Sequence, residues 1–161
     1  MDAREALINN LKTSAMVCGS YLDDLTDEEA MQRPHPKCNH INWQIGHLIA
    51  SEHMMASACG ELPALPKGFA DKYSKETTSS DNISDFVPKT ELMKIAATQH
   101  EAVVELIGNM SDEDFDKPGP ESMRSYAPTM GALANMLGSH WMMHAGQWVV
   151  LRRQLGRDIV I

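Results

Sequence analysis

The sequence predicts an all-α protein, a four-helix bundle with a long connection between the second and third helices. Four segments of about 20 to 26 residues place apolar side chains at three- and four-residue intervals, the spacing of one helix face. The chain contains 12 methionines and only 6% aromatic residues, which favours helix packing over a β sandwich. Alternation of polar and apolar residues never extends beyond a few positions, so no β hairpin is predicted.

Composition limits the classes of function. A length of 161 residues fits one domain covering 1–161. The net charge of −8 argues against nucleic-acid binding, because affinity for phosphate backbones comes from clustered Lys and Arg. No apolar run reaches the roughly 18–20 residues of a membrane span. The N-terminus lacks the apolar core of a secretory signal, and the three cysteines show no CxxC spacing. We therefore expect a cytoplasmic protein with reduced thiols and no membrane partner.

The first half of the chain predicts two long helices. Apolar residues step by three and four through 3–25, which predicts the first. Thr26 and Glu29 then have the spacing of a capping box, which opens a short helical turn ended by prolines. Asn39 can cap the second long helix, over 40–59.

The second half begins with a long connection, 60–87, punctuated by proline, glycine and a polar cluster. Its length suggests that it covers a site or lies across a partner. A third helix is predicted over 88–109. Ser111 and Asp114 then repeat the spacing of the earlier capping box, which hints at two related helix-loop-helix halves. A loop rich in proline and glycine, 115–127, leads to the last helix.

The last helix, over 129–156, carries the clearest candidate site. Thr129 is its predicted N-cap, and Gly156 suits the position after its C-terminus. His140 and His144 lie on its apolar stripe, four residues apart, so that their rings are neighbours on one side of the helix. Such a pair can bind one metal ion, and a metal would give both buried imidazoles a partner. The alternative is a pair of hydrogen-bonded core or pocket histidines.

His47 is the best candidate for a third ligand. It lies in the middle of the second helix on the same flank as Trp43, with Gly46 beside it to permit close approach. The alternative for His47 is a single buried histidine bonded to a carbonyl. Three histidines from two helices would leave an open coordination position, which is the pattern of a catalytic rather than a structural zinc site.

No general base accompanies these histidines in the sequence. The segment H-W-M-M-H lacks the glutamate of H-E-x-x-H, so a zincin is excluded. Glu52 lies about 140° around the second helix from His47 and is not predicted to be a base. Gln147, one turn after His144, could orient a ligand. The remaining histidines receive lesser roles: His40 as a capping or pocket residue, His53 pointing elsewhere, His100 half-exposed and His35 in a loop.

Three segments resemble the DinB-like superfamily, which includes the YfiT-type metal-dependent hydrolases. They are L-T-D-E-E-A-M-Q-R-P before the second helix, W-x-x-x-H-L on it, and S-H-x-x-x-H-x-G-Q-x-x-x-x-R-R-Q-L-G on the last helix. The match spans essentially the whole chain. Its specificity rests on the spaced histidines and the H-x-G-Q segment.

The resemblance implies an up-down-down-up bundle, frequently a homodimer. It implies a divalent metal ion, most often nickel or zinc, held by His47, His140 and His144. Trp43 and Gln147 match recurrent family positions near the metal. Some relatives are transferases or isomerases that use a low-molecular-weight thiol, which implies a small-molecule substrate for this chain too.

Three functions remain open from the sequence. The first is a metal-dependent enzyme of the thiol-dependent transferase or hydrolase class. The second is a non-catalytic metal-binding or stress-associated helical dimer, which the missing base favours. The third is a structural bundle whose histidines are only pocket residues.

Overall fold

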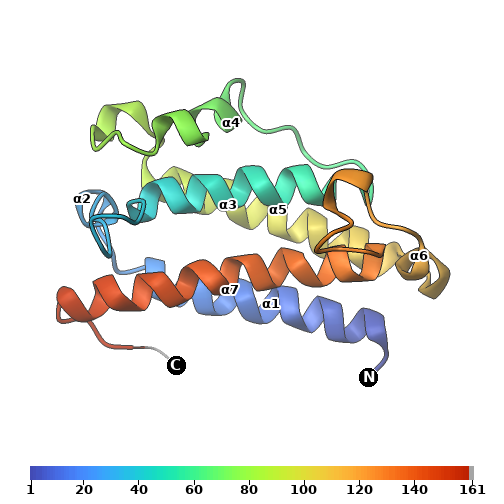
Figure 1. Cartoon of the computed structure of the whole chain (residues 1–161). Coiled ribbons are helices and arrows are strands. Elements are labelled where there is room, and N and C mark those ends of the chain that lie inside the picture. Colours follow the sequence, from blue (N-terminus) through green and yellow to red (C-terminus); the bar gives the residue numbers. More distant parts are fainter. Residues whose placement is uncertain (160–161) are drawn as a thin grey trace.

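The structure is a computed structural model, and it describes residues 1–159 (Figure 1). Four long helices form its body: α1 (Ala3–Leu22), α3 (Ile41–Ala56), α5 (Lys89–Asn109) and α7 (Met130–Gln154). The short elements are α2 (Asp27–Ala30), α4 (Phe69–Lys72), α6 (Asp112–Asp116) and three 3₁₀ turns, η1 (Lys75–Thr77), η2 (Ile83–Asp85) and η3 (Glu121–Met123). The described residues contain no β-strand, only one isolated bridge between Pro118 and Thr129. The predicted all-α four-helix bundle is confirmed.

The order of helix directions explains the long connection. α1 and α7 run one way, and α3 and α5 run the other way (Figure 1). α1 and α3 each pack against both α5 and α7, so α3 and α5 are parallel neighbours. The chain leaving α3 must therefore return along the whole helix, roughly 24 Å for its 16 residues, before α5 can begin. The bundle is up-down-down-up.

The returning connection packs onto the outer side of α3. The Tyr73 ring lies against Gly46, where a Cβ atom would come within 2.2 Å of it. The Trp43 indole donates a hydrogen bond to Thr77 Oγ1 over 2.9 Å. The Tyr73 hydroxyl accepts a bond from the Val87 amide over 3.0 Å. The close approach predicted at Gly46 is thus made by the connection, and α3 holds it in place.

Three predicted helix starts are confirmed and a fourth is wrong. Thr129 caps α7, where its hydroxyl accepts the Ala132 amide over 3.1 Å. Thr26 and Ser111 each form the reciprocal bonds of a capping box. The N-cap of α3 is His40 and not Asn39. His40 Nδ1 accepts a hydrogen bond from the Trp43 amide over 2.9 Å. The ring nitrogen thus takes the place of the side-chain oxygen that a capping Asn would have supplied. The capping role proposed for His40 is confirmed.

The interior of the bundle is closely filled by apolar side chains from all four long helices. The largest side chains without exposed surface include Trp148, Leu11, Ile45, Leu92 and Leu137. Burial of this kind stabilises the fold by about 1.5–3 kcal/mol for each large side chain. Within residues 1–159, no helix is long and apolar enough to cross a membrane.

The contact between Gly46 and Tyr73 gives a prediction about stability. We expect Gly46→Ala to lower the free energy of unfolding by about 1–3 kcal/mol, because the added methyl group forces the Tyr73 ring away. Gly19→Ala in α1 is the matched control, since its new Cβ would meet nothing within 4 Å. It should gain about 0.5–1 kcal/mol from helix propensity. Urea unfolding of both variants measures the difference, and equal stabilities would refute the packing argument.

Candidate metal centre

His47, His140 and His144 come together where α3 packs against α7. One ring nitrogen from each of the three side chains lies within 4.8 Å of the others. The ring centroids of His47 are 5.4 Å from His140 and 5.6 Å from His144, and those of His140 and His144 are 5.1 Å apart. The ring planes are tilted or perpendicular to one another, with angles of 46° to 90° between them. No cysteine, aspartate or glutamate of the described chain joins this cluster.

The three imidazoles are neutral at physiological pH. Burial, together with the neighbouring His47, lowers the pKa of His140 to about 4. Burial also lowers the pKa of His144 to about 4, with contributions from the other two rings, and it lowers the pKa of His47. A metal ligand must be the neutral imidazole with a free lone pair. The site therefore holds its histidines in the protonation state that metal binding requires.

Trp43 and Ser51 flank His47 on its own helix. The Trp43 ring stacks on the imidazole with a centroid distance of 5.0 Å and an angle of 9° between planes. Since the same indole is tied to Thr77, the connection between α3 and α5 fixes this wall of the site. Ser51 Oγ lies 3.5 Å from His47 Nδ1. Trp43 therefore restricts rotation of the His47 ring, which agrees with its predicted place beside the histidines.

The sequence analysis missed Gln44, which contacts the site directly. Its Oε1 atom lies 2.9 Å from His144 Nδ1 and accepts a bond of 2.9 Å from the Trp148 indole. Gln44 is 1% exposed. Gln147, which was predicted to orient a ligand, is half-buried, and within residues 1–159 the glutamine seen bonded to His144 is Gln44 instead. A signal was present, since Gln44 is a polar residue on an apolar flank of its helix, one turn before His47.

Glu52 belongs to a separate polar cluster. Its carboxylate accepts bonds from the Trp141 indole over 3.0 Å and from Gln99 Nε2 over 2.7 Å. It is 1% exposed, and burial raises its pKa to about 7 although both bonds act in the opposite direction. Both oxygens are committed to donors within the core. The prediction that Glu52 does not serve the triad as a base agrees with this placement.

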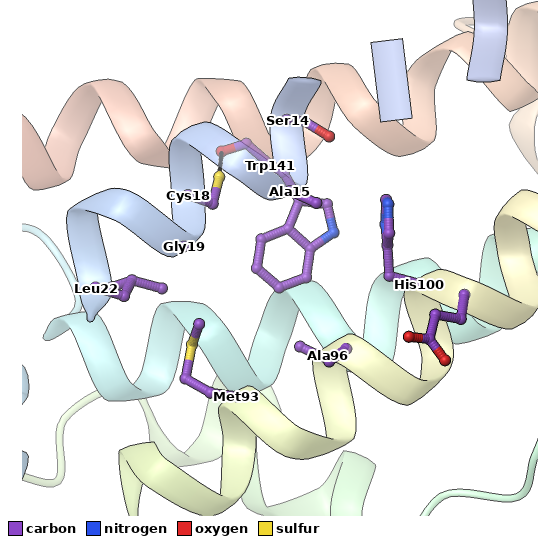
Figure 2. Close-up of a pocket in the computed structure, with 11 residues that line it drawn as sticks. Ser14, Ala15, Cys18, Gly19, Leu22, Met93, Ala96, His100 and Trp141 are labelled. Atoms are coloured by element: carbon purple, nitrogen blue, oxygen red, sulfur yellow. Dashed lines mark hydrogen bonds between the residues drawn. The ribbon is translucent and has the colours of Figure 1, made fainter. Parts of the chain in front are cut away.

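A cavity of about 220 Å³ lies between α1 and α5, away from the triad. Trp141 projects between these two helices and forms part of the wall, while Met93, Ala96 and His100 rise from α5 (Figure 2). Small residues line the hollow on both helices, Ala15 and Gly19 on α1 and Ala96 and Ala97 on α5. The cavity walls are mostly apolar.

The donor set suits a borderline metal ion. Neutral imidazoles bind zinc, nickel, copper and iron, and three of them leave coordination positions for other ligands. The fold and the site together define a four-helix bundle with a three-histidine centre shared between two helices. Residues 11–148 match the family model of the DinB superfamily, and the chain belongs to that superfamily.

A solved structure resembles this chain over most of its length. It is YfiT from Bacillus subtilis, described as a probable metal-dependent hydrolase with an unusual four-helix bundle topology. The two chains share 15% sequence identity, with a TM-score of 0.60, and the match covers 96% of this chain and 89% of YfiT. At this identity the likeness establishes the shared fold. No curated protein matches the chain.

Proposed function

We propose that this chain binds one divalent metal ion through His47, His140 and His144 and acts as a metal-dependent enzyme. The observation that carries the proposal is the convergence of three neutral imidazole nitrogens, from two helices, within 4.8 Å. The absence of a fourth ligand among the described residues favours a catalytic over a closed structural site. YfiT, with a similar fold, is described as a probable metal-dependent hydrolase.

The chain's own residues would hold and shield the ion. Bound there, the metal would supply Lewis-acid chemistry, either to polarise a substrate or to activate a thiol or water. His47 is held by the stacked Trp43, while His140 and His144 are spaced by one turn of α7. Nickel and zinc are the ions we favour. The reaction class we propose is hydrolysis or transfer to a low-molecular-weight thiol, in a cytoplasmic homodimer.

The metal content of the protein tests this proposal. We expect about one divalent ion per chain in protein purified without an affinity tag and incubated with nickel or zinc. The His140→Ala/His144→Ala variant should hold none, because only one imidazole of the triad, that of His47, remains. His53→Ala, outside the triad, is the control and should keep the ion. Elemental analysis measures all three. Equal metal content in the double variant and the wild type would refute the assignment.

A non-catalytic metal-binding role is the second candidate. The observation that favours it is that, within residues 1–159, the side chains seen hydrogen-bonded to the triad are Gln44 and Ser51, neither of which is an acid or a base. Assays of the metal-loaded protein with ester, amide and thiol-transfer substrates distinguish the catalytic from the non-catalytic role. A stoichiometric metal with no turnover in such a panel would support the non-catalytic role.

A further inference from the structure

Gln44 links the proposed metal site to the core of the bundle. Its side-chain amide is almost completely buried and makes three contacts. Nε2 donates to the Asn39 carbonyl over 2.7 Å, and Oε1 faces both the Trp148 indole and His144 Nδ1, each at 2.9 Å. The residue thereby joins the start of α3 to two positions on α7, one turn apart.

The partners of Gln44 determine which way its amide points. An indole N–H can only donate, and a backbone carbonyl can only accept. Trp148 therefore requires the oxygen of the amide on its side, and the carbonyl of Asn39 requires the nitrogen on the other. Exchanging the two ends would lose both bonds and bury an unpaired indole N–H, at a cost of about 1–3 kcal/mol. The bonds to Asn39 and Trp148 therefore fix the orientation of the amide whatever the state of His144.

This orientation decides the state of His144. Because the atom that faces Nδ1 is an acceptor, Nδ1 must carry the proton of the neutral ring. The lone pair of a neutral imidazole is then on Nε2. In metalloproteins a ligating histidine commonly donates its other N–H to an oxygen, which fixes both tautomer and ring orientation.

We infer that Gln44 is a positioning residue that commits His144 to bind metal through Nε2. Trp148 assists by holding the amide oxygen in place. The inference rests on the proposed metal site, but it makes a claim about the metal-free protein as well. Substituting Gln44 alone would leave the Trp148 indole unpaired. The informative comparison is therefore between Trp148→Phe and the double variant Gln44→Leu/Trp148→Phe.

The tautomer is measured first, on metal-free protein. Long-range ¹H–¹⁵N NMR spectra distinguish a protonated from an unprotonated ring nitrogen. We expect His144 to be protonated at Nδ1 in the wild type and in Trp148→Phe. In the double variant the form protonated at Nε2 should gain population, because the acceptor at Nδ1 is gone. A wild-type His144 protonated at Nε2 would overturn the inference, whether or not the protein binds metal.

Metal affinity is measured second, by competition of zinc and of nickel with a chromophoric chelator. The double variant should bind about 10- to 100-fold more weakly than Trp148→Phe. If the double variant binds as tightly as Trp148→Phe, the positioning role is refuted. If the wild type binds neither metal, the proposed function fails, and the tautomer measurement alone judges Gln44.

Discussion

Saturating zinc or nickel should stabilise the folded chain by about 4 kcal/mol when the free metal exceeds its Kd about 1,000-fold. The reason is linkage. The three nitrogens lie within 4.8 Å of one another only when α3 and α7 are packed together, so the assembled site exists in the folded state alone. Any ligand that binds only the folded state lowers its free energy relative to the unfolded chain.

The control for this prediction must account for the unfolded chain. The sequence contains seven histidines, and an unfolded chain can bind metal weakly through them, which opposes the effect. The His140→Ala/His144→Ala variant keeps the other five. Its stability should stay constant or fall slightly as metal is added. Urea unfolding with and without metal, followed by addition of chelator, measures the difference. Identical shifts in the two proteins would mean that the triad does not bind the ion.

The successful part of the sequence analysis concerned positions around single helices. Three- and four-residue spacing predicted the four long helices, and the bounds of α5 and α7 differ from the predicted ranges by only one or two residues. The same spacing placed His140 and His144 on one side of α7. His47 could be added because it is central in the second long helix, on the same flank as Trp43 and next to Gly46. Helical geometry fixes such relations without knowledge of the partner helix.

What the sequence analysis left out concerns contacts between elements that are distant in sequence. Gln44 and Gln147 both lie one turn from a triad histidine, and their spacing cannot distinguish them. What distinguishes them is that Gln44 faces Trp148, a contact across 104 positions. Gly46 was likewise assigned to close approach, but only the path of the connection shows that Tyr73 makes it. The Tyr73 contact follows from the parallel arrangement of α3 and α5, which the family resemblance implied but the spacing of apolar residues does not show.

Acid should destabilise the protein through His40, by about 3 kcal/mol between pH 6.5 and pH 4. This side chain is fully buried, and burial together with the charge of Arg33 lowers its pKa from 6.5 to about 4. Its Nδ1 atom accepts the Trp43 amide at the start of α3, so protonation there would remove the helix cap. In this pH range the unfolded state binds the proton and the folded state does not. Stability is therefore fully present above pH 6.5 and lost as the pH falls toward 4.

The variant His40→Asn isolates this contribution. Asparagine caps helices well and does not titrate, so the variant should lose less stability than the wild type as the pH falls. A pKa difference of about 2.5 units corresponds to about 3 kcal/mol. The lowered pKa values of His140 and His144 also reduce stability in acid, but they do so equally in both proteins. The difference between the two curves of stability against pH therefore reports His40 alone. Urea unfolding of the metal-free proteins from pH 8 to pH 4 provides the curves. They should run parallel above pH 6.5, where His40 is neutral in both states, and the wild-type curve should fall more steeply below it. Parallel curves over the whole range would show that His40 titrates alike in the folded and unfolded chain, and that its imidazole is not the cap on which the start of α3 depends.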